Sequence, residues 1–132
     1  MREQHTKHAT YKIAYHFVWC PKYRKTILVG DIATFIEGEI RRLCEANTWE
    51  IGALSVQEDH VHLFLSAPPA IAPSLIANTL KGITARQVFK QHPEVKKQLG
   101  GGNFWARSYY VGTVGDMTEE TVKKYIELGQ GT

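Results

Sequence analysis

Residues 49–66 have the sequence WEIGALSVQEDHVHLFLS, in which two runs of apolar and β-branched residues flank a short acidic segment. Each run, 49–56 and 61–66, has the composition of a β-strand. The segment that joins them is short enough to connect an antiparallel pair, so the sequence predicts a β-hairpin.

The predicted β-hairpin contains two histidines at alternate positions, His60 and His62. Alternate side chains of a strand lie on the same face, and this spacing allows both imidazoles to reach one metal ion. The apolar residues between and after them lie on the opposite face and are predicted to belong to the core: Val61, Leu63 and Leu65.

Hydrophobic periodicity and turn residues predict five further elements on either side of the β-hairpin. The order β-α-β-β-α-β of the first six elements predicts an α+β, ferredoxin-like (RRM-like) fold, with two helices on one face of a four-stranded antiparallel sheet. The last helix is an addition to that fold. The five are a strand over 10–20, a helix from its N-cap Asp31 to about Asn47, a helix opened by Pro73 that ends near His92, a strand over 108–114 and a helix from about Thr118 to Leu128.

Length and composition predict one globular domain. The chain has 132 residues, 43% of them hydrophobic, and the domain is expected to span 1–132 with its core over about 10–128. No apolar run approaches the length of a membrane span, and the polar N-terminus lacks a signal-peptide pattern. The cysteines, Cys20 and Cys44, favour reduced thiols in a cytosolic protein over a disulfide. A net charge of +3 is only weak evidence for a nucleic-acid partner.

The paired histidines are candidate metal ligands, because neutral imidazoles bind manganese, iron, zinc and other divalent ions. Two such ligands leave room for a substrate phosphate and water, as a catalytic metal requires. The alternative is a pair of ordinary strand histidines without a ligand. Asp59 and Glu58 precede the pair. They either orient the imidazoles, bind the metal ion themselves or only form the turn, and the turn is favoured.

Tyr125 lies in the predicted last helix and is a candidate nucleophile. A tyrosine hydroxyl can attack a phosphodiester to form a covalent phosphotyrosine, and a cation stabilises the charge that develops on the phosphoryl oxygens. A role in packing is the alternative, because the chain has six tyrosines.

Basic and aromatic residues alternate after the first strand, an arrangement that can hold phosphates while an aromatic ring such as that of Trp19 stacks on a base. Further cations stand on the second long helix and before the strand at 108–114. The alternative for each is a solvated charge. The candidate DNA contacts are Lys22, Arg24, Lys25, Lys81, Arg86 and Arg107.

Several segments, taken in order, resemble one known family. Residues 15–24 are Tyr-His-Phe-Val-Trp-Cys-Pro-Lys-Tyr-Arg, 59–63 are Asp-His-Val-His-Leu, and 124–127 are Lys-Tyr-Ile-Glu. Residues 80–86 and 103–109 also resemble family segments. The set spans nearly the whole chain and is similar to the small single-tyrosine HUH transposases of the insertion-sequence 200/605 family. HUH denotes histidine, bulky hydrophobe, histidine.

The resemblance implies a transposase that cleaves and rejoins single-stranded DNA at the ends of an insertion sequence through a 5′-phosphotyrosine. It implies that Tyr125 is the nucleophile and that His60 and His62 hold a divalent ion, usually Mg²⁺ or Mn²⁺. It also implies a homodimer, recognition of subterminal DNA hairpins as structures, and a cytoplasmic prokaryotic protein.

One position departs from the family pattern. The family's third metal ligand is a glutamine four residues after the tyrosine, where this chain has Gly129, followed by Gln130. On a helix, a step of five residues directs Gln130 about 140° away from Tyr125. Gln130 is the candidate third ligand if the helix unwinds there. Otherwise water or Asp59 takes this position, or the ligand is missing.

Two other functions stay open from the sequence. One is a domesticated HUH nuclease that acts on repeated hairpins in a host genome. The other is a non-catalytic nucleic-acid binding module on the same sheet, as in RNA-recognition domains. Those domains rely on aromatic residues of the sheet face, whereas this sheet presents paired histidines.

Overall fold

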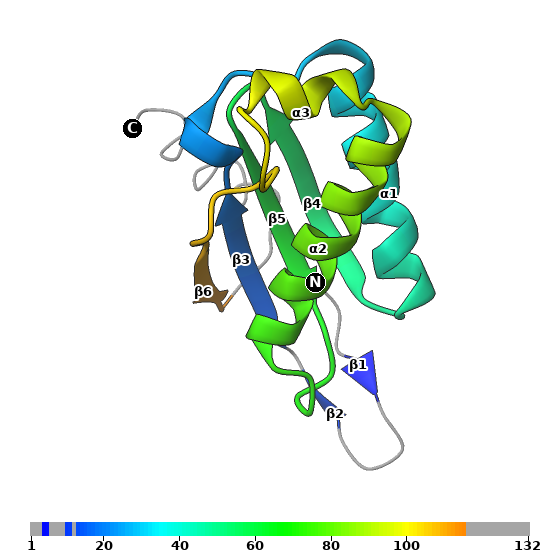
Figure 1. The fold of residues 1–132 in the computed structure, drawn as a ribbon. Coiled ribbons are helices and arrows are strands. Elements are labelled where there is room, and N and C mark those ends of the chain that lie inside the picture. Colours follow the sequence, from blue (N-terminus) through cyan, green and yellow to red (C-terminus); the bar gives the residue numbers. More distant parts are fainter. Residues whose placement is uncertain (1–3, 6–9, 12, 116–132) are drawn as a thin grey trace.

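In a computed structural model, the chain folds into a four-stranded sheet with two long helices on one face (Figure 1). The structure describes residues 4–5, 10–11 and 13–115. The strands are β1 (Gln4–His5), β2 (Thr10–Tyr11), β3 (Ala14–Trp19), β4 (Glu50–Gln57), β5 (His60–Ser66) and β6 (Tyr110–Val114), and the helices are η1 (Lys22–Arg24), α1 (Gly30–Ala46), α2 (Pro73–Gln91) and α3 (Glu94–Gln98).

The strand order β4-β5-β3-β6, with every neighbouring pair antiparallel, is that of the ferredoxin-like fold. The helices α1 and α2 both lie on one face of the sheet (Figure 1), and their apolar side chains share a single core with that face. The predicted fold class is therefore confirmed. The sequence did not predict the separate two-stranded sheet of β1 and β2.

The predicted β-hairpin is formed by β4 and β5. Gln57 pairs with His60, so Glu58 and Asp59 alone make the turn. Every residue of β5 is buried, and β4 and β3 flank it on either side. The residues predicted to face the core do so, each with 0% exposure: Val61, Leu63 and Leu65.

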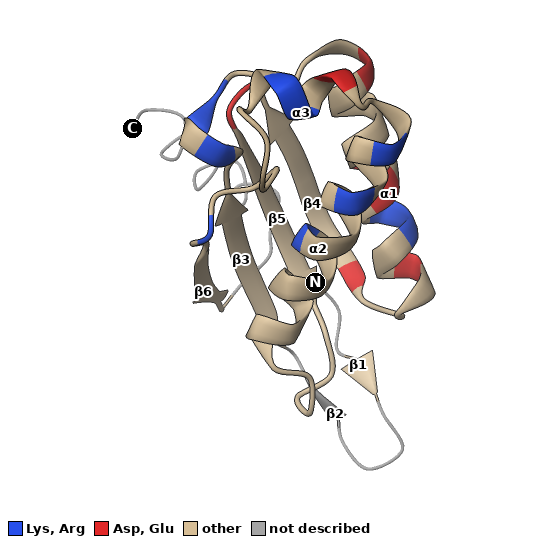
Figure 2. Cartoon of the chain, in the orientation of Figure 1, with Lys and Arg blue, Asp and Glu red and all other residues tan. Residues whose placement is uncertain are grey.

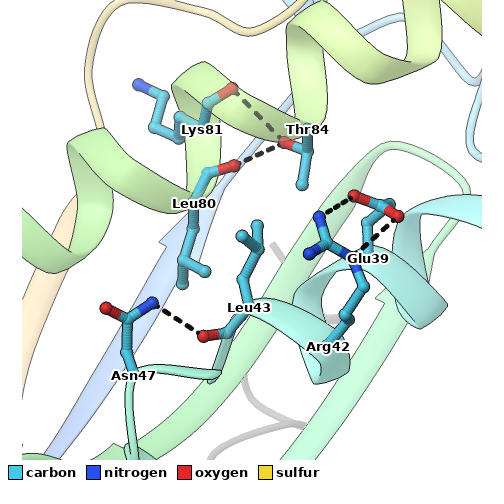
Figure 3. A network of polar contacts seen from close by, with 7 residues as sticks. All are labelled: Glu39, Arg42, Leu43, Asn47, Leu80, Lys81 and Thr84. Carbon is cyan, nitrogen blue, oxygen red and sulfur yellow. Dashed lines mark hydrogen bonds and ion pairs between the residues drawn. The ribbon is translucent and has the colours of Figure 1, made fainter. Parts of the chain in front are cut away.

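The helix α1 confirms the predicted apolar spacing but not the predicted cap. Val29 occupies the N-cap position, so the prediction that Asp31 is the N-cap is wrong. Asp31 lies in the first turn instead, where its charge still interacts favourably with the helix dipole. At the other end, the side-chain amide of Asn47 donates a hydrogen bond to the Leu43 carbonyl oxygen (2.8 Å; Figure 3). The residues that the helix buries are Ile36, Ile40, Leu43 and Cys44.

The segment between α3 and β6 is anchored to α2 by a buried polar contact. The Trp105 indole nitrogen donates to the hydroxyl of Thr84 at 2.9 Å. That hydroxyl in turn donates to the Leu80 carbonyl oxygen at 2.6 Å, the contact drawn in Figure 3. Trp19 packs edge-to-face on Trp105, and both rings are buried. The prediction that Trp19 stacks on a base is therefore wrong, because its ring belongs to the core.

Other boundaries differ from the predictions in limited ways. The predicted strand over 10–20 is two strands, β2 and β3, and β6 begins at Tyr110, two residues later than predicted. The sequence did not predict α3, whose five residues are too few to show a helical period. Both cysteines are free thiols, as predicted. The predicted helix over 118–128 lies outside the described residues.

Candidate functional site

The two histidines of the HUH triplet lie side by side on the sheet face that α1 and α2 do not cover. His60 begins β5 directly after the turn, and His62 follows it on the same face because strand side chains alternate. Their ring centroids are 4.8 Å apart and the rings are nearly perpendicular. His60 is 7% exposed and His62 is 1% exposed, so water reaches neither ring freely.

A carboxylate orients the first of these rings. Nδ1 of His60 lies 2.6 Å from Oδ1 of Asp59, whose other oxygen accepts a hydrogen bond from Nε of Arg24 at 3.0 Å. The bond with His60 is the main cause that lowers the pKa of the Asp59 carboxyl, and Arg24 adds to it. An ionised carboxylate can only accept hydrogen bonds, so Nδ1 of His60 is the donor. A neutral His60 therefore has its lone pair on Nε2.

Another imidazole contacts the second ring. Nδ1 of His62 lies 3.1 Å from Nε2 of His16, which stands on β3. Burial, followed by the nearby His60 and His16, lowers the pKa of His62 to about 4. His62 is therefore neutral at pH 7, which is the protonation state that a metal ligand requires.

The remaining ring nitrogens point to a missing partner. Nε2 of His60 and Nε2 of His62 are both buried, and neither has a hydrogen-bond partner among the residues that the structure describes. Buried polar atoms are nearly always paired, so two such atoms on neighbouring rings fit a cation that they would share. Within residues 4–5, 10–11 and 13–115, no three His, Cys, Asp or Glu side chains form a metal-binding group. The predicted third ligand, Gln130, and the predicted nucleophile, Tyr125, lie outside these ranges.

The low pKa of His62 predicts how stability changes with pH. The pKa is about 4 in the folded chain and 6.5 for an ordinary histidine, so the unfolded chain takes up the proton first as the pH falls. The stability that the neutral His62 contributes to the folded chain is fully present above pH 6.5 and is lost as the pH falls towards 4. We expect the free energy of unfolding of the metal-free protein to fall by up to about 3 kcal/mol over this window.

Urea denaturation at a series of pH values measures this dependence. His62→Asn is the matched control, because it has no titrating ring, and it should flatten most of the curve. A wild-type curve as flat as that of the variant would contradict the prediction.

The basic segment after β3 is tied to the rest of the fold at the end of the sheet where the acidic β4–β5 turn lies (Figure 2). Nζ of Lys22 donates to the carbonyl oxygens of Leu99 (3.2 Å) and Gly101 (2.8 Å). Lys25 donates to the carbonyl oxygen of Gln98, and Arg24 pairs with Asp59. These three cations therefore hold the segment in place, and their contact with DNA stays a prediction.

Lys81 also makes contacts within the chain. Its ammonium donates to three successive carbonyl oxygens, those of Ala106 (2.8 Å), Arg107 (3.2 Å) and Ser108 (3.3 Å). Burial lowers the pKa of Lys81. It lines a pocket of about 280 Å³ between α2 and residues 102–107, on whose rim Arg107 is exposed. Arg86 is exposed as well, so these two arginines are the more accessible candidates for phosphate.

The contrast between Lys81 and Arg107 gives a testable prediction. We expect Lys81→Met to lower the free energy of unfolding by about 1–3 kcal/mol, because three carbonyl oxygens lose a charged donor. Arg107→Met is the control and should change it by less than about 0.5 kcal/mol, since the side chain is exposed. Urea denaturation compares the two variants. If Lys81→Met is as stable as Arg107→Met, the Lys81 contacts contribute nothing to the free energy of unfolding.

His16 is a residue of this site that the sequence pattern does not reveal. The structure buries its ring and places it against His62. The register explains why: Val18 pairs with His62 and His16 with Phe64, so His16 and His62 are diagonal neighbours. Pattern alone does not give the register between strands that are distant in sequence.

Comparison with known proteins identifies the family. Residues 9–128 match the family described as "Transposase IS200 like". Over 117 residues, 89% of this chain and 84% of the relative, the chain is 41% identical to the ISDra2 transposase TnpA of Deinococcus radiodurans. It is 31% identical over 125 residues, 95% of this chain and 82% of the relative, to the transposase for insertion sequence element IS200 of Salmonella typhimurium.

Two solved structures have the same fold. A crystal structure of a transposase from Deinococcus radiodurans R1 superimposes with a TM-score of 0.79 and 36% identity, covering 94% of this chain and 95% of the other. A REP-associated tyrosine transposase bound to a REP hairpin gives a TM-score of 0.60 at 14% identity, covering 92% and 67%. No helix of the described residues is long and apolar enough to cross a membrane. The chain belongs to the family of IS200-like transposases, which are DNA-processing enzymes.

Proposed function

We propose that this protein cleaves and rejoins single-stranded DNA at the ends of an insertion sequence through a 5′-phosphotyrosine intermediate. The observation that carries the proposal is the pair of buried Nε2 atoms on His60 and His62, for which the described part of the chain offers no hydrogen-bond partner. We propose that they hold Mg²⁺ or Mn²⁺, with Gln130 as the candidate third ligand. A divalent ion there would polarise the oxygens of the scissile phosphate.

Tyr125 is the proposed nucleophile. Its hydroxyl oxygen gives up a proton and attacks phosphorus, which forms the phosphotyrosine bond. The bond from phosphorus to the 3′ oxygen breaks, and that oxygen takes up a proton to become the 3′ hydroxyl. The phosphotyrosine conserves the energy of the broken bond, so rejoining needs no nucleotide cofactor. When a 3′ hydroxyl attacks the phosphotyrosine, the DNA bond forms again and the tyrosine is released.

The proposed substrate is single-stranded DNA with subterminal hairpins, and the protein is proposed to act as a homodimer in the bacterial cytoplasm. Phosphates attract cations on a protein surface. Exposed cations are present on α2 and next to β6, at Arg86 and Arg107 (Figure 2). The REP-associated transposase, which shares the fold at low identity, was solved with a hairpin.

The test is a covalent adduct. The protein is incubated with a single-stranded oligonucleotide that carries a hairpin from the end of an IS200-like element, with Mn²⁺ or with a chelator. A denaturing gel should show a protein–DNA species that forms only with metal. Hairpin binding without any adduct would instead support a non-catalytic binding module. An adduct with repeated host hairpins alone would support a domesticated nuclease.

A further inference from the structure

We infer that His16 is a positioning residue for His62: its Nε2 accepts the hydrogen bond of Nδ1 of His62 and so keeps the Nε2 lone pair of His62 directed at the metal position. The inference rests on the proposed metal function. It assigns a role to a residue of β3 that belongs to neither the HUH triplet nor the tyrosine helix. The contact that carries it is the 3.1 Å separation between Nε2 of His16 and Nδ1 of His62.

Two proton arrangements are compatible with this contact. In the first, His62 carries its proton on Nδ1 and donates to His16, which leaves Nε2 of His62 as a lone pair. In the second, His16 donates, and the proton of a neutral His62 is then on Nε2. That Nε2 is buried and no group of the described ranges accepts a hydrogen bond from it, so the second arrangement leaves an N–H donor unsatisfied there.

The energy of an unsatisfied donor favours the first arrangement. Burying an unpaired N–H group costs about 1–3 kcal/mol, which corresponds to a population ratio of about 5 to 150. The first arrangement leaves an unpaired lone pair instead, and a metal ion supplies the partner for it. The lone pair on Nε2 of His62 therefore has no partner without a cation and has one when a cation is bound.

The packing of His16 holds the acceptor in place. Its ring lies parallel to that of Phe64, at 4.3 Å between centroids and 4° between planes. It also lies nearly parallel to the His62 ring, at 5.3 Å and 15°. His16 is 7% exposed. The stacked, buried ring cannot turn away from His62 without breaking these contacts, so the β3–β5 register keeps the two ring nitrogens in contact.

The geometry also argues against His16 as the third metal ligand. Nε2 of His16 is the atom that faces His62, and an atom whose lone pair accepts a hydrogen bond cannot at the same time bind a metal ion. His16 instead has for His62 the role that Asp59 has for His60. In both cases the partner contacts Nδ1 of a ring whose Nε2 has no hydrogen-bond partner within the described residues. Metal-bound histidines usually make the same kind of hydrogen bond through the ring nitrogen that does not bind the metal.

The test uses NMR of the full-length, ¹⁵N-labelled protein without metal. Long-range ¹H–¹⁵N spectra at neutral pH distinguish protonated from bare ring nitrogens, and the signals of His62 are those that disappear in His62→Asn. We expect Nδ1 of His62 to be protonated and Nε2 to be bare. In His16→Phe, which keeps a ring against Phe64 but has no acceptor, we expect the Nε2–H form to appear. His16→Gln, whose Oε1 can accept the same bond, should retain the wild-type pattern.

Binding of Mn²⁺ provides the second readout. Loss of the group that hydrogen-bonds to a metal-binding histidine typically weakens metal binding by about 10–100-fold. We expect this loss for His16→Phe and an affinity close to wild type for His16→Gln. A wild-type His62 protonated on Nε2 would overturn the inference. So would a folded His16→Phe with unchanged His62 signals and unchanged Mn²⁺ affinity. A wild type that binds no Mn²⁺ contradicts the proposed metal function, and the spectra of the metal-free protein then still decide the role of His16.

Discussion

His62→Asn is expected to lower metal-dependent cleavage of a single-stranded DNA hairpin by at least about 100-fold, because several kcal/mol of charge stabilisation is lost with the metal ligand. Asparagine is the informative replacement. Its amide nitrogen takes the position of Nδ1 and can still donate to His16, while nothing replaces Nε2. His60→Asn is built on the same logic, because its amide can still donate to Asp59.

The measurement is single-turnover cleavage with increasing Mn²⁺, together with circular dichroism to confirm the fold. His92→Asn is the matched control, since His92 follows the end of α2 and contacts Phe35 and Glu94 rather than the site. It should cleave like the wild type. Cleavage at the wild-type rate by both His60→Asn and His62→Asn would exclude these two imidazoles as the metal ligands.

The sequence predicted those features of the site that depend on one strand alone. The spacing of His60 and His62 within an apolar run was enough to place both rings on one face, because alternation along a strand is a local property. The same rule correctly assigned Val61 and Leu63 to the helix-facing core. The short segment between the two apolar runs was likewise a local signal, and it predicted the β4–β5 hairpin.

Contacts that depend on register between distant strands were not predictable. His16 stands 46 positions before His62, and only the pairing of Val18 with His62 brings it to that ring. The side-chain contacts of Lys22 and Lys81 show the same limit. Their charges suggested DNA, but long-range folding brings carbonyl oxygens of residues 99–108 within their reach. Charge identifies a cation in a sequence and does not identify its partner.

The helix ends show how tertiary structure overrides a local preference. Asp31 is a good N-cap residue by type, yet the helix begins before it, at Gly30. Gly30 has a φ of +56°, a conformation that glycine adopts without strain, and it connects the helix to Val29. Leu28 precedes this junction, and its amide donates to the Glu58 carbonyl oxygen of the β4–β5 turn. The start of α1 is therefore set by a contact with the turn beside His60.

Tyr125→Phe is expected to abolish the covalent adduct, with a loss of at least about 1,000-fold, while DNA-hairpin binding stays close to wild type. Phenylalanine keeps the ring and removes only the attacking oxygen. The sharpest control is Tyr110→Phe, because Tyr110 is 56% exposed on β6 and its ring contacts His16, next to the histidine pair. A denaturing gel measures the adduct and a filter assay measures binding.

Comparison of the two variants identifies which tyrosine, Tyr125 or Tyr110, attacks the phosphate. If Tyr125 attacks the phosphate, Tyr110→Phe forms the adduct and Tyr125→Phe does not. The reverse result would make Tyr110 the nucleophile, since its ring already lies beside His16. An adduct in both single variants that disappears in the double variant would mean that either hydroxyl can reach the phosphate, and the assignment of Tyr125 alone would then be wrong. The predicted outcome requires the hydroxyl of residue 125, and not that of Tyr110 beside His16, to approach a phosphate bound to the metal ion proposed at His60 and His62.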